Sequence, residues 1–361
     1  LATNNAREIF AAIPGINIWE SDPAGIQLGI ATRGLNPNRS AMFNMRQNGY
    51  DMTPDAIGYP DGYYTPPTEA LDQVQLIRGA ASLQYGPQFG GLVNFILKKG
   101  PSEKPFEFTT RNSVGSFQKF HTFNSAGGTY KNLNYYSFFQ YKTGNGFRPN
   151  SHYDVYTGFV SGTFKINQRL SVTGEYTYMD YVTQQPGGLT YTAFLRNPAQ
   201  SSRSRNWFAV NWNMASIKLD YKIDENNTIN IRNFGFIGDR LALMDSASFS
   251  NPRFLERQDE IDKNRTLIAD YYRNIGSEGR YLKKYNLFKN KSSFLIGYRS
   301  YYGITEKIQG SGNNSKNPDF EFLTKYPDKP QSFNYTFPNQ NYALFSENVF
   351  NLTDKFSITP G

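Results

Sequence analysis

From Phe106 onward, apolar and polar residues alternate with a period of two in segments that are bounded by Gly, Asn, Asp and Pro. In the segment 216–223 the odd positions are apolar and the even positions are polar. The apolar set is Ile217, Leu219, Tyr221 and Ile223, and the polar set is Ser216, Lys218, Asp220 and Lys222. This alternation predicts β-strands with one apolar face, and we expect roughly eleven of them.

The second face of these strands decides between two architectures, because a soluble β-sandwich also alternates. That face carries Lys, Asp, Glu, Arg, Ser and Thr, and tyrosines gather near the strand ends. Lipid outside and water inside explain both features, so the pattern favours a membrane β-barrel. We therefore expect Ile217 and Leu219 to face hydrocarbon, and Lys218 and Asp220 to face the lumen.

The connections between the predicted strands differ in length, as in outer-membrane barrels with short periplasmic turns and long external loops. The expected short turns are Lys142–Arg148, Asn167–Arg169, Asp224–Asn227 and Asn351–Lys355. The expected long loops are Thr183–Asn206, Ala242–Arg265 and Gln309–Asn341.

The first hundred residues have a different texture and predict a small α+β unit. A short helix is expected over Ala6–Ala12, and Pro14-Gly15 ends it. Short strands are expected at Ile16–Trp19, Leu28–Arg33, Met42–Asn48, Val74–Ile77 and Val93–Leu97. The charged, proline-containing stretch Lys98–Pro105 separates this unit from the alternating region, so we expect two domains, at 1–101 and 102–361.

Composition narrows the function classes. Aromatic residues make up 16% of the chain and cysteine is absent, which excludes disulfides and thiolate metal sites. No catalytic constellation, phosphate loop or zinc spacing is present with supporting context, so we expect no enzyme, no metal site and no cofactor. The net charge of +8 comes from dispersed Lys and Arg, which argues against nucleic acid as a partner.

The stretch Leu71–Gly100 contains a Gln-Val strand that ends at Arg78-Gly79, a Tyr85-Gly86 turn, and Gly90-Gly91-Leu92-Val93-Asn94-Phe95. These sequence motifs resemble the end of the plug domain of TonB-dependent outer-membrane receptors. Upstream segments fit the same family in order, namely Ile13–Ile16, Gly29–Ser40 and Gln47–Tyr50. The ferric-citrate and siderophore receptors are the most similar subgroup, through Gly34–Pro37, Gly86–Gln88 and Gln185–Leu189.

The resemblance implies a 22-stranded barrel with the plug inside, of which this chain holds most of the plug and about half of the strands. It implies that a secretion signal and a TonB-contacting segment precede residue 1 and that further strands follow residue 361. It also implies location in the bacterial outer membrane, contact with lipid and lipopolysaccharide, and import of a ferric chelate powered by TonB and its inner-membrane complex.

Plug arginines of this family pair with glutamates of the barrel wall. By position, Arg33 and Arg78 are the candidate arginines, and Glu175 and Glu347 are the candidate acceptors. Facing lipid would cost these glutamates a few kcal/mol, so we expect both to point inward.

The predicted cargo site combines plug loops with the first long barrel loop. The plug candidates are Asn38, Arg39, Asp61, Tyr63 and Tyr64, and the loop candidates are Arg196, Arg203 and Arg205. The loop arginines form a basic cluster without acidic neighbours in sequence, and arginine binds carboxylates in bidentate fashion, which suits an anionic ferric chelate.

Other cargoes stay open. The segment Gly58–Pro67 departs from the ferric-citrate pattern, so another carboxylate-type chelate, haem, cobalamin, a carbohydrate or a peptide is an alternative. A passive pore or an adhesion barrel is a second alternative, but neither requires a folded plug.

Overall fold

The computed structural model describes two domains joined between Leu97 and Glu107. The described residues are 6–10, 13–20, 22–55, 62–77, 83–85, 90–245, 259, 261–288, 290–323, 333–353 and 355–361. Within these residues, no helix is both long enough and apolar enough to cross a membrane.

The N-terminal domain is built from two small sheets and short 3-10 helices. One sheet pairs β1 (Ile16–Glu20) with β2 (Leu28–Thr32). The other has the order β4-β3-β6-β5. Its strands are β3 (Asn44–Gln47), β4 (Tyr50–Asp51), β5 (Leu71–Ile77) and β6 (Leu92–Leu97). The 3-10 helices are η1 (Ala6–Ile9), η2 (Asn38–Ser40), η3 (Thr68–Ala70) and η4 (Leu83–Tyr85), so the expected helix over Ala6–Ala12 is a single short turn where it is described.

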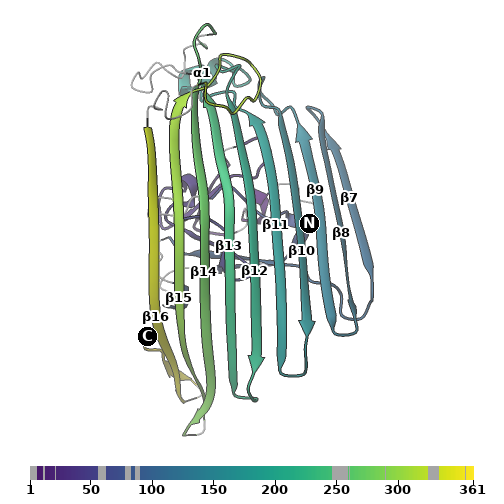
Figure 1. The fold of residues 1–361 in the computed structure, drawn as a ribbon, viewed down its shortest axis with the longest axis vertical. Helices are drawn as coiled ribbons and strands as arrows, with labels where there is room; N and C mark the ends of the chain where they lie inside the picture. Colours follow the sequence, from purple (N-terminus) through teal and green to yellow (C-terminus); the bar gives the residue numbers. More distant parts are fainter. Residues whose placement is uncertain are drawn as a thin grey trace.

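The second domain is one antiparallel sheet of 11 strands in which each strand pairs with its neighbours in sequence. The strands are β7 (Glu107–Gly115), β8 (Lys119–Tyr130), β9 (Leu133–Gly144), β10 (Tyr153–Lys165), β11 (Leu170–Gln184), β12 (Trp207–Lys222), β13 (Asn227–Met244), β14 (Thr266–Leu287), β15 (Asn290–Ser311), β16 (Phe333–Thr353) and β17 (Phe356–Ile358). Figure 1 shows these strands as a curved wall with the N-terminal domain, in purple, against one face. The predicted small α+β unit followed by a large antiparallel sheet is therefore present.

The alternation of β12 divides its residues between the two faces of the wall. Trp212 and Met214 are fully buried, and the Trp212 indole donates a hydrogen bond to the Met52 carbonyl of the N-terminal domain at 3.1 Å. Even positions therefore face inward. Ile217, at 61% exposure, lies on the outer face with the other odd positions, as the alternation predicts.

The connections at one end of the wall are all short turns, whereas the other end carries the long loops together with the short β7–β8 connection 116–118 (Figure 1). The long loops share one end, and the segment 185–206 there includes the helix α1 (Tyr191–Arg196). The expected short turn Lys142–Arg148 is wrong: β9 ends at Gly144 and β10 begins at Tyr153, so residues 145–152 form a loop at the long-loop end. The short turn of this region is Lys131-Asn132, between β8 and β9.

The hydrophobic core is shared by both domains. One continuous cluster includes Tyr50, Met52 and Phe95 of the N-terminal domain, together with Val155 and Phe236 of the strands. The inner face of the wall is therefore filled by folded protein where these residues meet.

The outer face can be tested by placing a charge on it. Leu219→Arg should lower the free energy of unfolding in lipid vesicles, because the guanidinium would face hydrocarbon. The cost of such a charge is roughly 2–4 kcal/mol at the middle of the bilayer and falls toward its surfaces. Equilibrium unfolding of the vesicle-inserted protein, followed by tryptophan fluorescence, measures this.

The control for this test is Lys218→Arg on the inner face, which keeps the charge and should change the stability little. Equal losses for the two variants would contradict the assignment of faces, because a slip of one residue exchanges them.

Candidate functional site

The contact between the domains is centred on one buried arginine. Arg46 of β3 is 0% exposed, and its guanidinium donates to both carboxylate oxygens of Glu278 on β14, each at 3.1 Å. The same guanidinium donates to the Gly49 carbonyl at 2.9 Å and to the Asn44 amide oxygen at 3.3 Å. All these partners hold Arg46 in one orientation.

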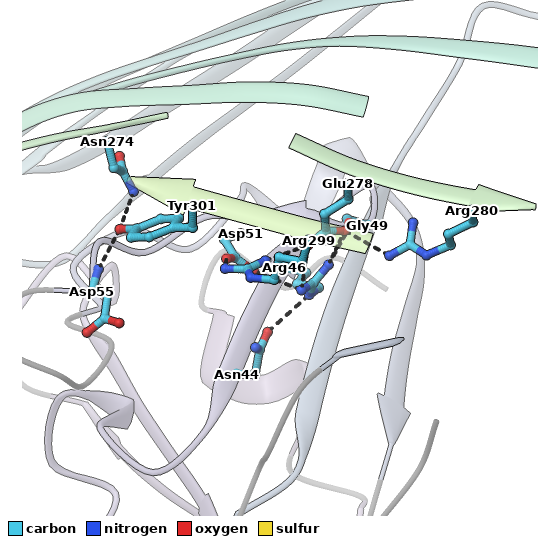
Figure 2. A network of polar contacts seen from close by, with 10 residues as sticks. All are labelled: Asn44, Arg46, Gly49, Asp51, Asp55, Asn274, Glu278, Arg280, Arg299 and Tyr301. Atoms are coloured by element: carbon cyan, nitrogen blue, oxygen red, sulfur yellow. Dashed lines mark hydrogen bonds and ion pairs between the residues drawn. The ribbon is translucent and has the colours of Figure 1, made fainter. Parts of the chain in front are cut away.

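Two further arginines bind to Glu278, and one of them also binds to Asp51, as Figure 2 shows. Arg299 of β15 bonds to both carboxylates, and Arg280 donates to Glu278 at 2.8 Å. Asp51 lies 3.1 Å from the Arg46 guanidinium. Three guanidinium groups and two carboxylates therefore share this volume, which we call the charge cluster: Arg46, Asp51, Glu278, Arg280 and Arg299.

Local structure places each member of the charge cluster. Glu278 and Arg299 stand directly opposite each other in the β14–β15 register, and Arg280 lies two residues along on the same face. In the N-terminal domain, Asn48 and Gly49 both have positive φ, at 50° and 89°, and form the two-residue turn between β3 and β4. Asn-Gly suits such a turn, and the hairpin brings Asp51 opposite Arg46.

Burial and pairing act in opposite directions on the charge of Arg46. Burial lowers the pKa of its guanidinium, but the carboxylates of Asp51 and Glu278 outweigh burial and raise the pKa above its ordinary value. Arg46 is therefore held firmly in its charged form. A buried ion pair of this kind adds little net stability compared with well-packed apolar side chains of the same volume. Loss of one partner, however, leaves an uncompensated buried charge.

Residues next to Arg46 extend the contact along the wall. Gln47 donates to Thr177 at 2.8 Å, and Asn48 donates to Glu175 at 3.0 Å. Further along, the Asp55 amide donates to the Tyr301 hydroxyl at 3.2 Å. The segment 46–55 therefore follows the inner face from β11 to β15.

A second polar contact lies on β8 and β9. Glu69 of η3 is 3.7 Å from the His121 ring, and Gln140 lies 3.0 Å from the same ring nitrogen. Lys142 is buried on β9, opposite His121 in the register. The N-terminal domain thus meets charged side chains on two separate parts of the wall.

At the long-loop end, a cavity of about 740 Å³ lies between the domains. Its N-terminal lining is Arg7, Glu20, Asp22 and Pro23, and its strand-domain lining is Gly146, Phe147, Arg148, Ser151, Thr183, Gln184, Gln185, Pro186, Gly187, Gly188 and Asn206. We call it the outer cavity. Its walls mix guanidinium, carboxylate, amide and hydroxyl groups, which suits a polar ligand.

The predicted plug–barrel residues have mixed outcomes. Glu175 points inward and contacts the N-terminal domain, but its partner there is Asn48, and its nearest arginine is Arg232 of the wall at 3.7 Å. Arg33 is exposed at a turn. Glu347 is half-buried on β16, and Arg78 lies outside the described residues.

The predicted apex residues are placed differently from the expectation where the structure describes them. Tyr63 and Tyr64 are 4% and 1% exposed. Tyr63 packs on Trp212, and Tyr64 donates to Gln47 at 3.2 Å, so neither presents a surface to solvent. They serve the contact between the domains, because aromatic rings in this position fill the space beside the wall.

The remaining plug candidates stay predictions. Asn38 is exposed, while Asp61 and the side chain of Arg39 lie outside the described part of the chain.

The predicted basic cluster of the long loop is wrong for two of its three arginines. Arg203 and Arg205 are 2% and 1% exposed. Arg205 pairs with Asp245 at 3.1 Å, and Arg203 lies 3.9 Å from Asp259. The counter-charges come from another loop and were invisible in the sequence around 196–205. Arg196 is exposed on α1.

Sequence reasoning missed Arg46 and Glu278, although a signal was present. Arg46 is the one charged residue of the predicted strand Met42–Asn48, and a charge in a strand buried on both faces needs a partner. Glu278 lies in the strand Thr266–Leu287, close to Gly276 and Gly279. Arg33 and Arg78 were predicted instead because each directly precedes a glycine at the end of a predicted strand.

Comparisons with known proteins agree with this architecture. Residues 1–92 match the family model described as TonB-dependent Receptor Plug Domain. The unliganded ferric citrate transporter FecA superposes with a TM-score of 0.79 at 19% identity, over 96% of this chain and 51% of that one. The ferripyoverdine receptor of Pseudomonas aeruginosa gives 0.72 at 15% identity, over 99% and 48%.

A third solved structure, the copper transporter OprC, gives a TM-score of 0.69 at 12% identity, over 98% of this chain and 51% of that one. The chain thus spans about half the length of these proteins.

The charge cluster predicts a large loss of stability on removal of its central carboxylate. Glu278→Gln keeps the shape and one acceptor oxygen but removes the negative charge that Arg46, Arg280 and Arg299 share. We expect a loss of about 3–5 kcal/mol in the free energy that holds the N-terminal domain in place. Denaturant unfolding measures it when followed by the fluorescence of Trp212, which contacts both domains, in a background where Trp19 and Trp207 are replaced by Phe.

The matched control is Lys104→Gln, which removes one partner of the exposed pair Lys104–Glu107. Exposed pairs are screened by water and contribute little, so its unfolding midpoint should stay close to that of the wild type. A Glu278→Gln midpoint that equals the control would show that the charge cluster does not hold the two domains together.

Proposed function

We propose that this chain, which has the plug domain and part of the barrel of a TonB-dependent outer-membrane receptor, takes part in the active import of a ferric chelate. The observation that carries the proposal is the folded plug between the outer cavity and the opposite end of the barrel wall. A ligand bound in the outer cavity would touch the plug directly through Glu20, Asp22 and Pro23.

The plug also argues for active transport over a passive pore or an adhesion barrel. Met52, Phe95 and Arg46 pack or bond against the wall, so solute cannot pass along these contacts without movement of the plug. Movement of the plug that breaks this buried ion pair costs several kcal/mol of free energy. We infer that TonB and its inner-membrane complex supply it, while lipid and lipopolysaccharide surround the barrel.

For the cargo, we propose a chelate that presents carboxylate groups, such as ferric citrate or a carboxylate-type siderophore. Arg7 and Arg148 both line the outer cavity, and guanidinium groups form charge-assisted hydrogen bonds with carboxylates. Arg148 also donates from Nε to the Gln200 carbonyl at 2.8 Å and from Nη2 to the Pro186 carbonyl at 3.3 Å, so a cargo carboxylate would meet a guanidinium already held in place by the loop. The solved relatives are named for ferric citrate, ferripyoverdine and copper, so the fold itself serves several metal cargoes. A carbohydrate is the second candidate, because amide and hydroxyl groups together with Phe147 line the same cavity.

The cargo is tested by binding and uptake together. Purified protein should bind ferric citrate or another ferric carboxylate chelate, and Arg148→Ala should weaken binding about ten- to a hundredfold, as expected for the loss of one charge-assisted hydrogen bond. Arg148→Lys should recover only part of that loss, since the bidentate fork is gone. Titration with a panel of ferric chelates and simple sugars measures the affinities.

The control is Arg169→Ala, an exposed arginine in the short turn at the opposite end of the wall. It should leave affinity and uptake unchanged. Binding of sugars but no ferric chelate would refute the cargo, and uptake that persists in cells without TonB would refute the energy source.

A further inference from the structure

Three loop segments meet at the long-loop end of the wall around two buried arginines. The segments are 185–206, 261–265 and 312–323, and the arginines are Arg205 and Arg265. Each of these arginines is only 1% exposed. Because burial of a guanidinium is costly unless it is hydrogen-bonded, its partners show what it holds together.

Arg265 joins the third segment to the first. Its Nε donates to the Asn313 carbonyl at 3.0 Å, and its Nη2 donates to the Asn313 side chain at 2.5 Å and to Ser315 at 3.2 Å. Its Nη1 donates to the carbonyls of Asn317 and Arg205, each at 2.9 Å. One side chain therefore contacts two separate loops.

Arg205 completes the connection from the other side. Its Nη1 donates to the Lys263 carbonyl at 3.0 Å and to the Asn314 carbonyl at 3.1 Å. Its Nη2 donates to the Asp245 carboxylate at 3.1 Å. The neighbouring Trp207 indole donates to the Lys316 carbonyl at 2.7 Å. Each segment is thus tied to the other two by hydrogen bonds.

Only arginine suits both positions. Its five donors lie in one plane and reach acceptors on several sides at once, whereas a lysine ammonium has three donors on a compact head. Burial, with a further contribution from Arg205, lowers the pKa of Arg265 from its ordinary value, yet an arginine in a protein stays charged at neutral pH.

This connection reaches the outer cavity through Asn206. The Asp245 amide donates to the Asn206 side-chain oxygen at 2.9 Å, and the Gln185 amide donates to the Asn206 carbonyl at 2.9 Å. Asn206 and Gln185 both line the outer cavity. The position of that wall of the cavity therefore depends on residues that do not touch it.

We propose that Arg205 and Arg265 are positioning residues that join the segments 185–206, 261–265 and 312–323 into one rigid wall, assembled before any cargo arrives. The wall holds Asn206 and Gln185 in place at the outer cavity. This inference goes beyond the proposed function, because it concerns the geometry of the loops and holds whatever the cargo is.

The rigidity is measured by pulsed electron paramagnetic resonance on purified protein without cargo. Nitroxide labels at Tyr191, which is 77% exposed on α1, and at Glu321, which is also exposed, report the distance between two of the segments. The wild type should give one narrow distance distribution. Arg265→Ala should broaden it by about twofold or more, since the segments would open independently.

Two further variants separate a positioning role from a general loss of structure. Arg265→Lys keeps the charge and should rescue the narrow distribution only in part, because the planar set of donors is lost. Asn313→Ala removes one acceptor of Arg265 and should broaden the distribution to a smaller degree. The matched control is Arg196→Ala, an exposed arginine of α1, which should leave the distribution unchanged.

Folding of each variant is checked by gel electrophoresis in detergent, in which a folded barrel migrates differently before and after heating. Distributions as narrow as the wild type in both folded Arg265→Ala and Asn313→Ala would overturn the proposal. Because no cargo is present, that outcome leaves the proposed transport function unaffected, and failure of chelate binding leaves the loop wall unaffected.

Discussion

The buried pair of Arg46 and Glu278 is the interaction on which the arrangement of the two domains depends. A guanidinium and a carboxylate taken out of water are tolerated only if each finds the other in good geometry. This requirement links a hairpin of the plug to one height on β14 and β15, where Glu278 faces Arg299. The contacts of Trp212 with Met52 and Tyr63 join the two domains in the same arrangement.

The middle of the wall and its long-loop end have different roles. At the middle of the wall, charged and aromatic contacts fix the plug and fill the lumen. At the long-loop end, the outer cavity lies between the plug and the loops, and the loop wall around Arg205 and Arg265 supports one side of it. A ligand in the cavity therefore meets a supported wall on the barrel side and plug residues on the other.

Several residues have a different role in the structure from the one that the sequence predicts, because their partners come from distant parts of the chain. Arg203 and Arg205 have no acidic neighbours in sequence and were expected to bind an anion, but Asp245 and Asp259 reach them from another loop. Tyr63 and Tyr64 were expected at an exposed apex and instead pack beside β12. In each case a local pattern described the residue type correctly, while the partner came from a distant part of the chain.

The sequence by itself determined the strands and their faces. Alternation with a period of two is a local property, so the outward position of Ile217 and the inward position of Glu175 could be predicted without knowledge of the fold. The resemblance of the first domain to a receptor plug was also visible in its motifs, and residues 1–92 match the model of that plug family.

Only the tertiary structure decided which charges pair. Arg46 and Glu278 are separated by 232 residues, and Arg205 and Asp245 by 40. Contact between these residues depends on the register of the strands and on the position of the N-terminal domain against the wall. No local pattern in the sequence carries that information.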